Sequence, residues 1–252
     1  MSLKDKTIVV TGGSRGLGLG LVEALADQGA KVTVVARDRA ALAAVQQRLG
    51  VATISADITE EGAAQRILAD VRPEVLVLNA GATPRMGRLD QLSWADFTAT
   101  WETDVKAGLY WLQAALNQPL NAGSRVLVGS SGAAENGSPL SGGYAGTKRM
   151  LWFMARYANG IAKQKRLGIR FQAILPMQII GGTGVGDEAS SAYARSMGLE
   201  REAYLARFGA PLPPRQFGDH VVALLDDPQY ATGVAFGLKG DTGIAVLERE
   251  AA

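Results

Sequence analysis

A tyrosine and a lysine stand four residues apart in the sequence, at Tyr144 and Lys148. Residues at this spacing lie on one face of an α-helix, one turn apart, so the phenol and the ammonium would point the same way. A free tyrosine has a pKa of about 10 and is a poor base near neutrality, but an adjacent ammonium favours the phenolate. The pair could therefore perform general acid–base chemistry on a substrate oxygen, although the same spacing also fits an ordinary surface contact.

A glycine-rich segment, TGGSRGLG at residues 11–18, follows the first strand-like run of the chain. Gly12, Gly16 and Gly18 would let the backbone turn tightly and approach a pyrophosphate, which free N–H groups of a following helix would bind. The spacing is GxxxGxG and not the general GxGxxG fingerprint. A glycine turn can also be purely structural, but its position after the first strand favours a dinucleotide site.

The residues after the second strand-like run indicate which dinucleotide is bound. An NAD site would carry an acidic residue there, about twenty residues beyond the loop, to bind the ribose 2′-hydroxyl. This chain has Ala36 followed by Arg37, and Arg15 lies inside the glycine loop. Two guanidinium groups favour the 2′-phosphate of NADP, although Asp38 nearby weakens the preference. We predict NADP(H) as the cofactor, with NAD(H) less favoured.

The elements that must position these residues alternate regularly along the chain. Short apolar, β-branched runs occur at 7–11, 31–36, 51–56, 74–79, 124–130, 169–175 and 233–238. Helix-like stretches separate them, including 93–118, 143–167 and 187–208. This alternation predicts an α/β fold, a doubly wound, Rossmann-like parallel sheet of about seven strands with helices on both faces. We find no linker, so residues 1–252 are expected to form a single domain with its ligand at the carboxyl ends of the strands.

The composition excludes several classes of function. The chain has no cysteine and one histidine, so disulfides, thiolate catalysis and a cysteine- or histidine-rich metal site are excluded, and no metal is predicted. The 26 basic residues are scattered and the net charge is +2, which gives no nucleic-acid or lipid patch. No apolar run approaches the roughly 18 residues of a membrane span, and the first residues leave no room for a signal peptide. We expect a cytoplasmic protein without nucleic-acid or membrane partners.

Four motifs in the correct order resemble the short-chain dehydrogenase/reductase family. They are TGxxxGxG at 11–18, NAG at 79–81, a serine thirteen residues before a tyrosine, and YxxxK at 144–148. The resemblance implies an oxidoreductase that interconverts a carbonyl and an alcohol by hydride transfer, with a small-molecule substrate. It implies that Tyr144 is the general acid/base, that Lys148 lowers the pKa of Tyr144 and binds the nicotinamide ribose, and that Ser131, not its neighbour Ser130, orients the substrate oxygen.

The resemblance also assigns cofactor contacts along the chain. Asp57 resembles a residue that contacts adenine, residues 79–81 resemble the segment beneath the cofactor, and Ile179 resembles a contact to the nicotinamide carboxamide. The full set implied is Gly12, Ser14, Arg15, Gly16, Leu17, Gly18, Arg37, Asp57, Ile58, Asn79, Ala80, Gly81, Tyr144, Lys148, Pro176 and Ile179.

The chain departs from the family pattern near the lysine. Where the family commonly has an asparagine that supports a water chain from the lysine, this chain has Asp104, which we include among the candidate catalytic residues. A carboxylate there could pair with Lys148 and leave Tyr144 harder to ionise, or it could simply accept the same hydrogen bonds. Met177 replaces the glycine of a usual Pro-Gly pair, and Thr183 comes two residues later than a cofactor-binding threonine of the family.

The substrate itself is not specified by the sequence. Residues 181–210 begin glycine-rich and polar before becoming helix-like, and we interpret them as a mobile substrate lid, although a plain loop is an alternative. The predicted substrate wall comprises residues 181–200 together with Ala133, Ala134, Pro139 and Leu140.

All four tryptophans fall in the two helix-like segments that flank the 124–130 strand. In the resembled family these helices commonly form a dimer interface, so Trp94, Trp101, Trp111 and Trp152 would suit a homodimer or homotetramer. Ordinary core packing explains them equally well.

A second hypothesis is a catalytically weakened NADP(H)-binding sensor or scaffold, motivated by Asp104 and Met177. Retention of Ser131, Tyr144 and Lys148 argues against it, because a protein without catalysis has no chemical need for all three. Non-redox chemistry on the same fold, such as dehalogenation, is weaker still, because it has no use for a dinucleotide loop.

Overall fold

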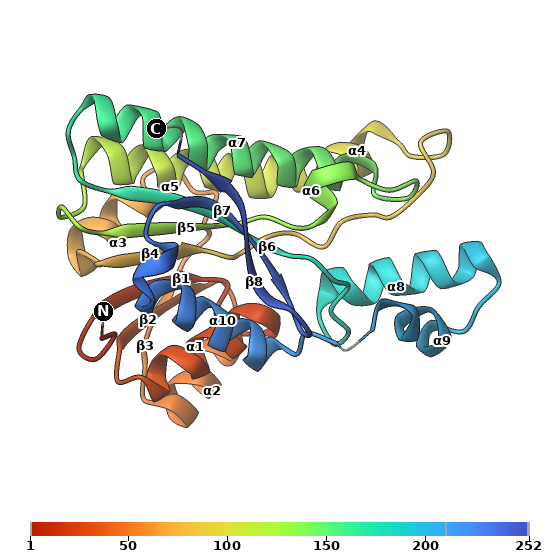
Figure 1. Cartoon of the computed structure of the whole chain (residues 1–252), viewed down its shortest axis with the longest axis horizontal. Coiled ribbons are helices and arrows are strands. Elements are labelled where there is room, and N and C mark those ends of the chain that lie inside the picture. Colours follow the sequence, from red (N-terminus) through yellow and green to blue (C-terminus); the bar gives the residue numbers. More distant parts are fainter. Residues whose placement is uncertain (1, 210, 251–252) are drawn as a thin grey trace.

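A single sheet organises the computed structural model, which describes residues 2–209 and 211–250 (Figure 1). Residues 1, 210, 251 and 252, including both ends of the predicted domain and the last residue of the predicted lid, lie outside the described residues. Within the described chain the sheet has eight strands in the order β3-β2-β1-β4-β5-β6-β7-β8. Their bounds are β1 Thr7–Thr11, β2 Lys31–Ala36, β3 Ala52–Ser55, β4 Val75–Leu78, β5 Arg125–Gly129, β6 Arg170–Pro176, β7 Gly233–Lys239 and β8 Gly243–Arg249.

Both faces of the sheet are buried by helices, which explains the continuous apolar strands. On β1, Ile8 and Val10 join one hydrophobic core while Val9 joins the other, as the two-residue side-chain period of a strand requires. Ile8 and Val10 pack with α1 (Gly16–Asp27), α2 (Arg39–Leu49) and α10 (Pro214–Asp226). Val9 packs with α3 (Ala63–Val71), α5 (Lys106–Asn117) and α7 (Gly142–Gln164). The predicted doubly wound α/β fold is confirmed.

The strand order reverses between β1 and β4, which pair in parallel side by side although β2 and β3 lie between them in sequence. The crossover connections leave this position in opposite directions, so a crevice opens at the carboxyl ends of β1 and β4. The glycine-rich segment after β1 and the NAG segment after β4 both border it.

An additional strand, β8, pairs antiparallel with β7 and extends the expected count of about seven strands to eight. The connection at residues 240–242 is a short hairpin, and Gly243 has a left-handed φ of +73° at its exit. This edge strand is only partly buried, and its apolar residues 244–247 are followed directly by two charged residues.

Two long helix-like segments are interrupted in the structure. Residues 93–118 form α4 (Trp94–Thr100), a π-helical turn (Trp101–Val105) and α5. Residues 187–208 divide into α8 (Gly184–Met197), α9 (Arg201–Leu205) and a 3-10 turn (Ala206–Phe208). Gly198 ends α8 with a left-handed φ of +65°, a conformation that glycine adopts without strain. Shorter elements are α6 (Ala133–Asn136) and a 3-10 turn at Pro228–Tyr230. Helices α8 and α9 project beyond the sheet (Figure 1).

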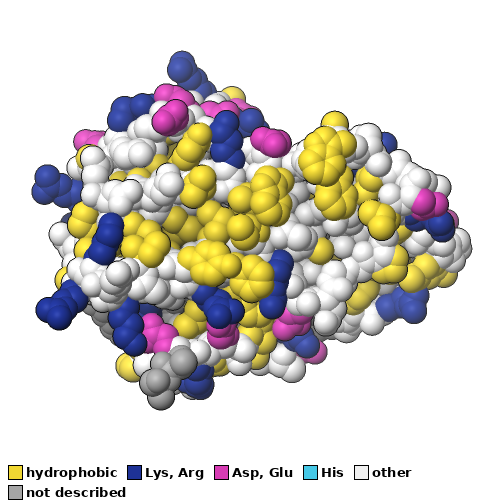
Figure 2. Space-filling model, turned by 90° about the horizontal axis from the view of Figure 1, so that it is seen from above, with side chains coloured by type: hydrophobic (Ala, Val, Ile, Leu, Met, Phe, Trp, Pro, Cys, Tyr) yellow, Lys and Arg dark blue, Asp and Glu magenta, His cyan; other side chains and the backbone are white. Residues whose placement is uncertain are grey.

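The four tryptophans divide between the core and the surface. Trp111 and Trp152 are buried, whereas Trp94 and Trp101 are exposed on α4 and the π-helical turn. Figure 2 shows hydrophobic side chains gathered on the face that carries α4, α5 and α7. Core packing therefore accounts for two of the tryptophans and leaves the other two at the surface.

No helix in residues 2–209 or 211–250 is long and apolar enough to span a bilayer.

Candidate active site

A cavity of about 960 Å³ follows the carboxyl ends of the parallel strands. Its walls include the glycine-rich segment after β1, the NAG segment after β4, the serines after β5 and the predicted lid after β6. Most of the predicted site residues line it: Ser14, Arg15, Leu17, Arg37, Asp57, Ile58, Asn79, Ala80, Gly81, Ser131, Tyr144, Lys148, Pro176, Ile179, Gly12 and Gly16. Gly18 and Asp104 are not part of its lining.

The glycine-rich segment needs glycine for reasons of space. Gly12 has a φ of +69°, and a Cβ atom on it would lie 2.7 Å from the Cα atom of Ala80. A Cβ atom on Gly18 would lie 2.2 Å from the carbonyl oxygen of Gly12. Gly18 therefore packs α1 against the turn from behind the cavity, and its assignment as a cofactor contact stays a prediction.

The N-terminus of α1 presents free backbone donors to the cavity. Its N-cap residue, Arg15, makes no side-chain capping hydrogen bond, and the first turn contains no acidic residue. Ser14, Gly16 and Leu17 of this turn line the cavity. Unpaired N–H groups and the positive end of the helix dipole favour an anion at this position. The loop and the helix end therefore fit the pyrophosphate of a dinucleotide.

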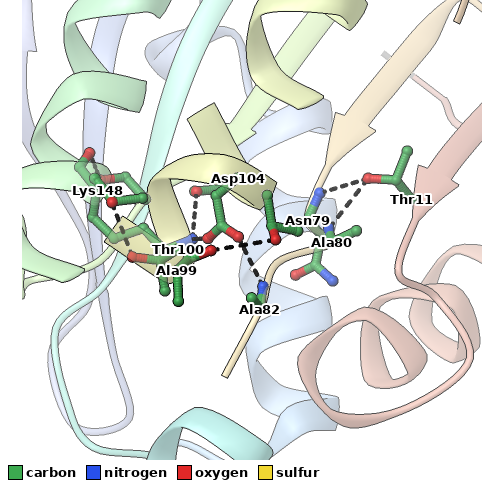
Figure 3. Close-up of polar contacts among 12 residues, drawn as sticks. Thr11, Asn79, Ala80, Ala82, Ala99, Thr100, Asp104 and Lys148 are labelled. Carbon is green, nitrogen blue, oxygen red and sulfur yellow. Dashed lines mark hydrogen bonds and ion pairs between the residues drawn. The ribbon is translucent and has the colours of Figure 1, made fainter. Parts of the chain in front are cut away.

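The NAG segment is fastened to β1 by the hydroxyl of Thr11. The backbone N–H groups of Asn79 and Ala80 donate to Thr11 Oγ1 at 3.1 and 3.2 Å (Figure 3). The Thr11 hydroxyl in turn donates to the carbonyl oxygen of Val77 at 3.3 Å. The Asn79 side chain donates to the carbonyl oxygen of Gly12 at 3.4 Å. These bonds hold two walls of the cavity in a fixed relation.

The opposite end of the cavity carries exposed charges beside β2 and β3. Asp57 accepts hydrogen bonds from the backbone N–H and the hydroxyl of Thr59, at 2.9 and 2.7 Å. These bonds, helped by Arg37 4.0 Å away, hold the pKa of Asp57 below its ordinary value despite some desolvation. Asp38 instead caps α2, because its carboxylate accepts from the N–H groups of Ala40 and Ala41, both at 3.0 Å.

Tyr144 and Lys148 lie on α7 as the four-residue spacing predicts, and both are buried where they border the cavity. The Lys148 ammonium lies 5.7 Å from the centre of the Tyr144 ring. Ser131 follows β5, and its Oγ accepts from the N–H of Ala133 at 3.2 Å, which leaves its own hydrogen to donate. The hydroxyl of Ser130 is already committed to the carbonyl oxygen of Lys148 at 2.8 Å. Ser131 is thus the free hydroxyl of the two.

Asp104 reaches Lys148 from the π-helical turn (Figure 3). Its Oδ2 lies 3.0 Å from Lys148 Nζ, and its Oδ1 accepts from the N–H of Ala82 at 2.7 Å. The side chains of Lys148 and Asp104 are 9 % and 1 % exposed. Burial opposes the charge on Lys148, but Asp104 and Tyr144 outweigh burial and raise the pKa of Lys148 above its ordinary value. The pairing that the sequence left open is present.

An aromatic cluster from the predicted lid closes the far side of the cavity. The rings of Tyr193 and Tyr204 stack at 5.7 Å, and Phe208 meets Tyr204 edge-on at 5.2 Å. The Tyr193 hydroxyl bonds the hydroxyl of Ser138 and accepts from the N–H of Leu140 at 3.2 Å. The sequence pattern did not single out these three aromatic residues, because only the folded chain brings α8 and α9 over the serine loop.

The predicted substrate wall needs a correction on its other side. Ala133 lines the cavity, but Ala134, Pro139 and Leu140 do not. The short helix α6 turns Ala134 into the hydrophobic core, and Leu140 is buried as well. Serines and glycines of the same loop, together with residues from the π-helical turn and the segment before α4, line the cavity instead: Gly137, Ser138, Ser141, Glu102, Thr103, Thr83 and Met86.

Charged side chains are unevenly distributed over the cavity lining. Of the residues that the structure describes there, Arg15, Arg37, Asp38 and Asp57 lie toward β2 and β3. Beyond Lys148, the lid side contains only Glu102. Among the described residues no group of three or more His, Cys, Asp or Glu side chains is placed to hold a metal ion.

Thr183 takes a place beside the glycine-rich segment despite its later position in the sequence. A Cβ atom added to Gly16 would lie 3.6 Å from Thr183 Cγ2, so Thr183 faces the glycine turn with room for little more than a methyl group between them. Thr183 caps α8 by accepting from the N–H of Gly186 at 3.0 Å. The Thr183 hydroxyl donates to the carbonyl oxygen of Ile180 at 2.8 Å.

Comparison with known proteins gives consistent relatives. Residues 6–193 match the family model described as short chain dehydrogenase. L-fucose dehydrogenase of Rattus norvegicus is 27 % identical over 242 residues, covering 93 % of this chain and 88 % of that protein. NADPH-dependent pterin aldehyde reductase of Arabidopsis thaliana is 26 % identical over 181 residues, covering 68 % and 74 %.

A solved structure shares the fold. It is the 3-ketoacyl-(acyl-carrier-protein) reductase from Brucella melitensis complexed with NADH, which superposes with a TM-score of 0.76 at 21 % identity. The match covers 95 % of this chain and 99 % of that one.

Proposed function

The chain belongs to the short-chain dehydrogenase family, and on this premise we propose that it is an NADP(H)-dependent oxidoreductase that interconverts a carbonyl and an alcohol. The observation that carries the proposal is the joint placement of two groups on one cavity. At one end are the glycine turn and the free N-terminus of α1; at the other are Ser131, Tyr144 and Lys148. An anion site and a proton donor facing one cavity suit hydride transfer to a bound carbonyl.

The side chains have distinct roles in this proposal. A bound reduced nicotinamide would supply the hydride to the carbonyl carbon. Tyr144 would donate its hydroxyl proton to the carbonyl oxygen, and Ser131 would donate a hydrogen bond that holds that oxygen in place. In the oxidation direction the tyrosinate would accept the alcohol proton. Lys148 would act on Tyr144 through its charge.

Preference for NADP over NAD is supported by the side chains beside β2. Arg37 is exposed, borders the cavity, and has only Asp57 at 4.0 Å as an ion-pair partner among the described residues. Asp38, the carboxylate that weakened the sequence argument, is occupied in capping α2. A guanidinium that is open to the cavity suits a 2′-phosphate.

The substrate end supports an uncharged carbonyl compound. The described lining residues on the lid side supply one carboxylate, Glu102, and no cation other than Lys148, so an anionic group would find no partner there. We propose that the whole chain works as one domain with residues 181–210 as its lid. The cytoplasmic location stays a prediction from the sequence.

We further propose self-association through the face that carries α4, α5 and α7. Trp94, Trp101, Leu109 and Tyr157 are exposed on it, and apolar aromatic side chains of this kind are typical anchors of interfaces. A homodimer or homotetramer would cover them.

A second candidate function is a cofactor-binding sensor or scaffold with weakened catalysis. The buried Asp104–Lys148 ion pair favours it, because a lysine neutralised by a carboxylate activates Tyr144 less. The two functions share the cofactor site and differ in turnover.

The proposal is tested by cofactor binding followed by turnover. Titration of the purified protein with NADPH and, separately, NADH, followed by nucleotide fluorescence, should show tighter binding of NADPH. A panel of aldehydes and ketones with NADPH should then reveal reduction that Tyr144→Phe abolishes while NADPH binding persists. Binding without turnover would favour the sensor, and binding of neither nucleotide would refute both functions.

A further inference from the structure

The ion pair between Asp104 and Lys148 lies directly behind the proposed proton donor. Lys148 Nζ is 3.0 Å from Asp104 Oδ2 and 5.7 Å from the centre of the Tyr144 ring. Asp104 does not line the cavity, so it reaches the reacting atoms only through Lys148. Its second oxygen is fixed by the N–H of Ala82 at 2.7 Å (Figure 3).

Three elements place polar groups around the Lys148 ammonium. The π-helical turn contributes Asp104, α7 contributes Tyr144, and β5 contributes the uncharged carbonyl oxygen of Gly129 at 3.4 Å. Among the described residues, no other titratable group interacts with Lys148. The ammonium and the carboxylate therefore form a pair of zero net charge, whose effect on Tyr144 is weaker than that of a lone ammonium.

We propose that Asp104 is a positioning residue that neutralises Lys148, so that Tyr144 remains a protonated acid near neutral pH and the site is set for carbonyl reduction. This inference rests on the proposed function for the identity of the reaction. In that reaction the carbonyl carbon gains a hydride from the reduced nicotinamide, the C=O π bond breaks, and the oxygen gains the proton of Tyr144. Water then reprotonates the tyrosinate.

The two directions need opposite forms of Tyr144. Reduction uses the phenol as an acid, whereas oxidation uses the phenolate as a base. A neutral pair behind the tyrosine keeps the phenol protonated over a wider pH range. The reduction rate should therefore hold to higher pH, and oxidation should require a more alkaline medium.

The decisive variant is Asp104→Asn, which removes the charge and keeps an oxygen that can accept from Ala82. Lys148 then faces Tyr144 without compensation and favours the phenolate. We expect the midpoint of Tyr144 ionisation to fall by about one pH unit, at the lower end of the shifts that a nearby charge causes. The pH profile of the oxidation rate should move by the same amount.

Tyrosine ionisation can be followed by ultraviolet absorbance in the protein without cofactor or substrate. The chain has six tyrosines, so each titration is repeated in a Tyr144→Phe background and subtracted to isolate Tyr144. The matched control is Asp96→Asn, which removes one negative charge from an exposed position on α4 outside the cavity lining and keeps an oxygen that can accept from Ser93. This control should leave the midpoint unchanged.

An unchanged midpoint in folded Asp104→Asn protein would overturn the inference, as would an equal shift in Asp96→Asn. If Asp104→Asn does not give the native circular dichroism spectrum, Asp104→Ser removes the same charge with a smaller side chain and is judged by the same midpoint. Because this readout needs no turnover, it stands apart from the cofactor and substrate assays that test the proposed function.

Discussion

Two ion pairs each have a member in the lining of the same cavity, and they differ in their access to water. Arg37 and Asp57 are 4.0 Å apart, with side chains 75 % and 45 % exposed. Lys148 and Asp104 are 3.0 Å apart, with side chains 9 % and 1 % exposed. Water screens the Arg37–Asp57 pair, so its charges are available to a ligand. The buried Lys148 and Asp104 instead interact strongly with each other.

The difference extends to the rest of each region. At the open end the anion site is made of backbone, from glycines and helix N–H groups, and its charged side chains can change with little effect on the fold. At the closed end the chemistry depends on side chains from three segments, the π-helical turn, the loop after β5 and α7, held by buried polar contacts. Substitutions of charged side chains at the open end should therefore change cofactor affinity, whereas substitutions at the closed end should change both stability and catalysis.

The largest expected effect comes from removing the cation at the closed end. Lys148→Met leaves the Asp104 carboxylate buried without its partner, which should lower the free energy of unfolding by about 3–5 kcal/mol. Adding Asp104→Asn removes the stranded charge, so the double variant should regain much of this loss. Urea unfolding followed by circular dichroism measures both; equal stability of the single and double variants would contradict a strong buried pair.

At the open end the largest effect should come from a glycine. Gly18→Ala places a Cβ atom 2.2 Å from the carbonyl oxygen of Gly12, so the glycine turn must shift. We expect the Kd for NADPH to rise at least about tenfold, or 1.4 kcal/mol. Gly160→Ala is the matched control, because a Cβ atom there meets nothing within 4 Å and α7 should gain about 1 kcal/mol. Unchanged NADPH affinity in Gly18→Ala would show that the turn has another role.

Removing the exposed cation should separate binding from stability. Arg37→Ala should change the free energy of unfolding by less than about 0.5 kcal/mol. It should nevertheless weaken NADPH binding about tenfold, through a lost charge-assisted hydrogen bond, and leave NADH binding unchanged. Arg39→Ala, two residues on and outside the cavity lining, is the control for net charge. Equal loss for both nucleotides would remove the argument for NADP.

The stabilisation that each ion pair gives should be lost at opposite ends of the pH scale, and both losses should be small. The raised pKa of Lys148 means that its stabilisation is complete below the ordinary value of 10.5 and is lost as the pH rises through the higher folded-state value. The lowered pKa of Asp57 gives stabilisation that is present above 3.8 and is lost as the pH falls through the lower folded-state value.

Measuring the thermal unfolding midpoint between about pH 3 and pH 11 tests both the acid and the alkaline loss of stabilisation. Asp57→Asn should weaken only the acid dependence, and the Lys148→Met/Asp104→Asn double variant only the alkaline dependence. A change at the opposite end of the scale would mean that the two regions are coupled.

Local patterns allowed most of the fold to be predicted from the sequence. The seven parallel strands and the turn at Gly12 follow from apolar runs and glycine spacing, which are properties of short segments. Strand β8 is the exception, because it is only partly buried at the sheet edge and its pairing with β7 depends on the hairpin at residues 240–242. The π-helical turn at Trp101–Val105 has no signal in the periodicity of the segment that contains it.

The candidate site was predictable only in part. Tyr144 and Lys148 are identifiable from their four-residue spacing, whereas Ser131 and Asp104 are identifiable only through the family resemblance. The burial of the Asp104–Lys148 pair depends on how α5 and α7 pack, which no local pattern encodes. The aromatic side of the cavity, with Tyr193 above the serine loop, likewise arises from segments 55 residues apart in the chain.

Because two tryptophans are buried and two are exposed, the intrinsic fluorescence of the protein can report whether the exposed face is covered. Trp111 and Trp152 emit from the core, while Trp94 and Trp101 emit from the proposed contact face and are open to an iodide quencher. Association through that face would shield the second pair and leave the first unaltered. The quenchable fraction of the emission, followed during dilution, would therefore report association through this face without any label being added.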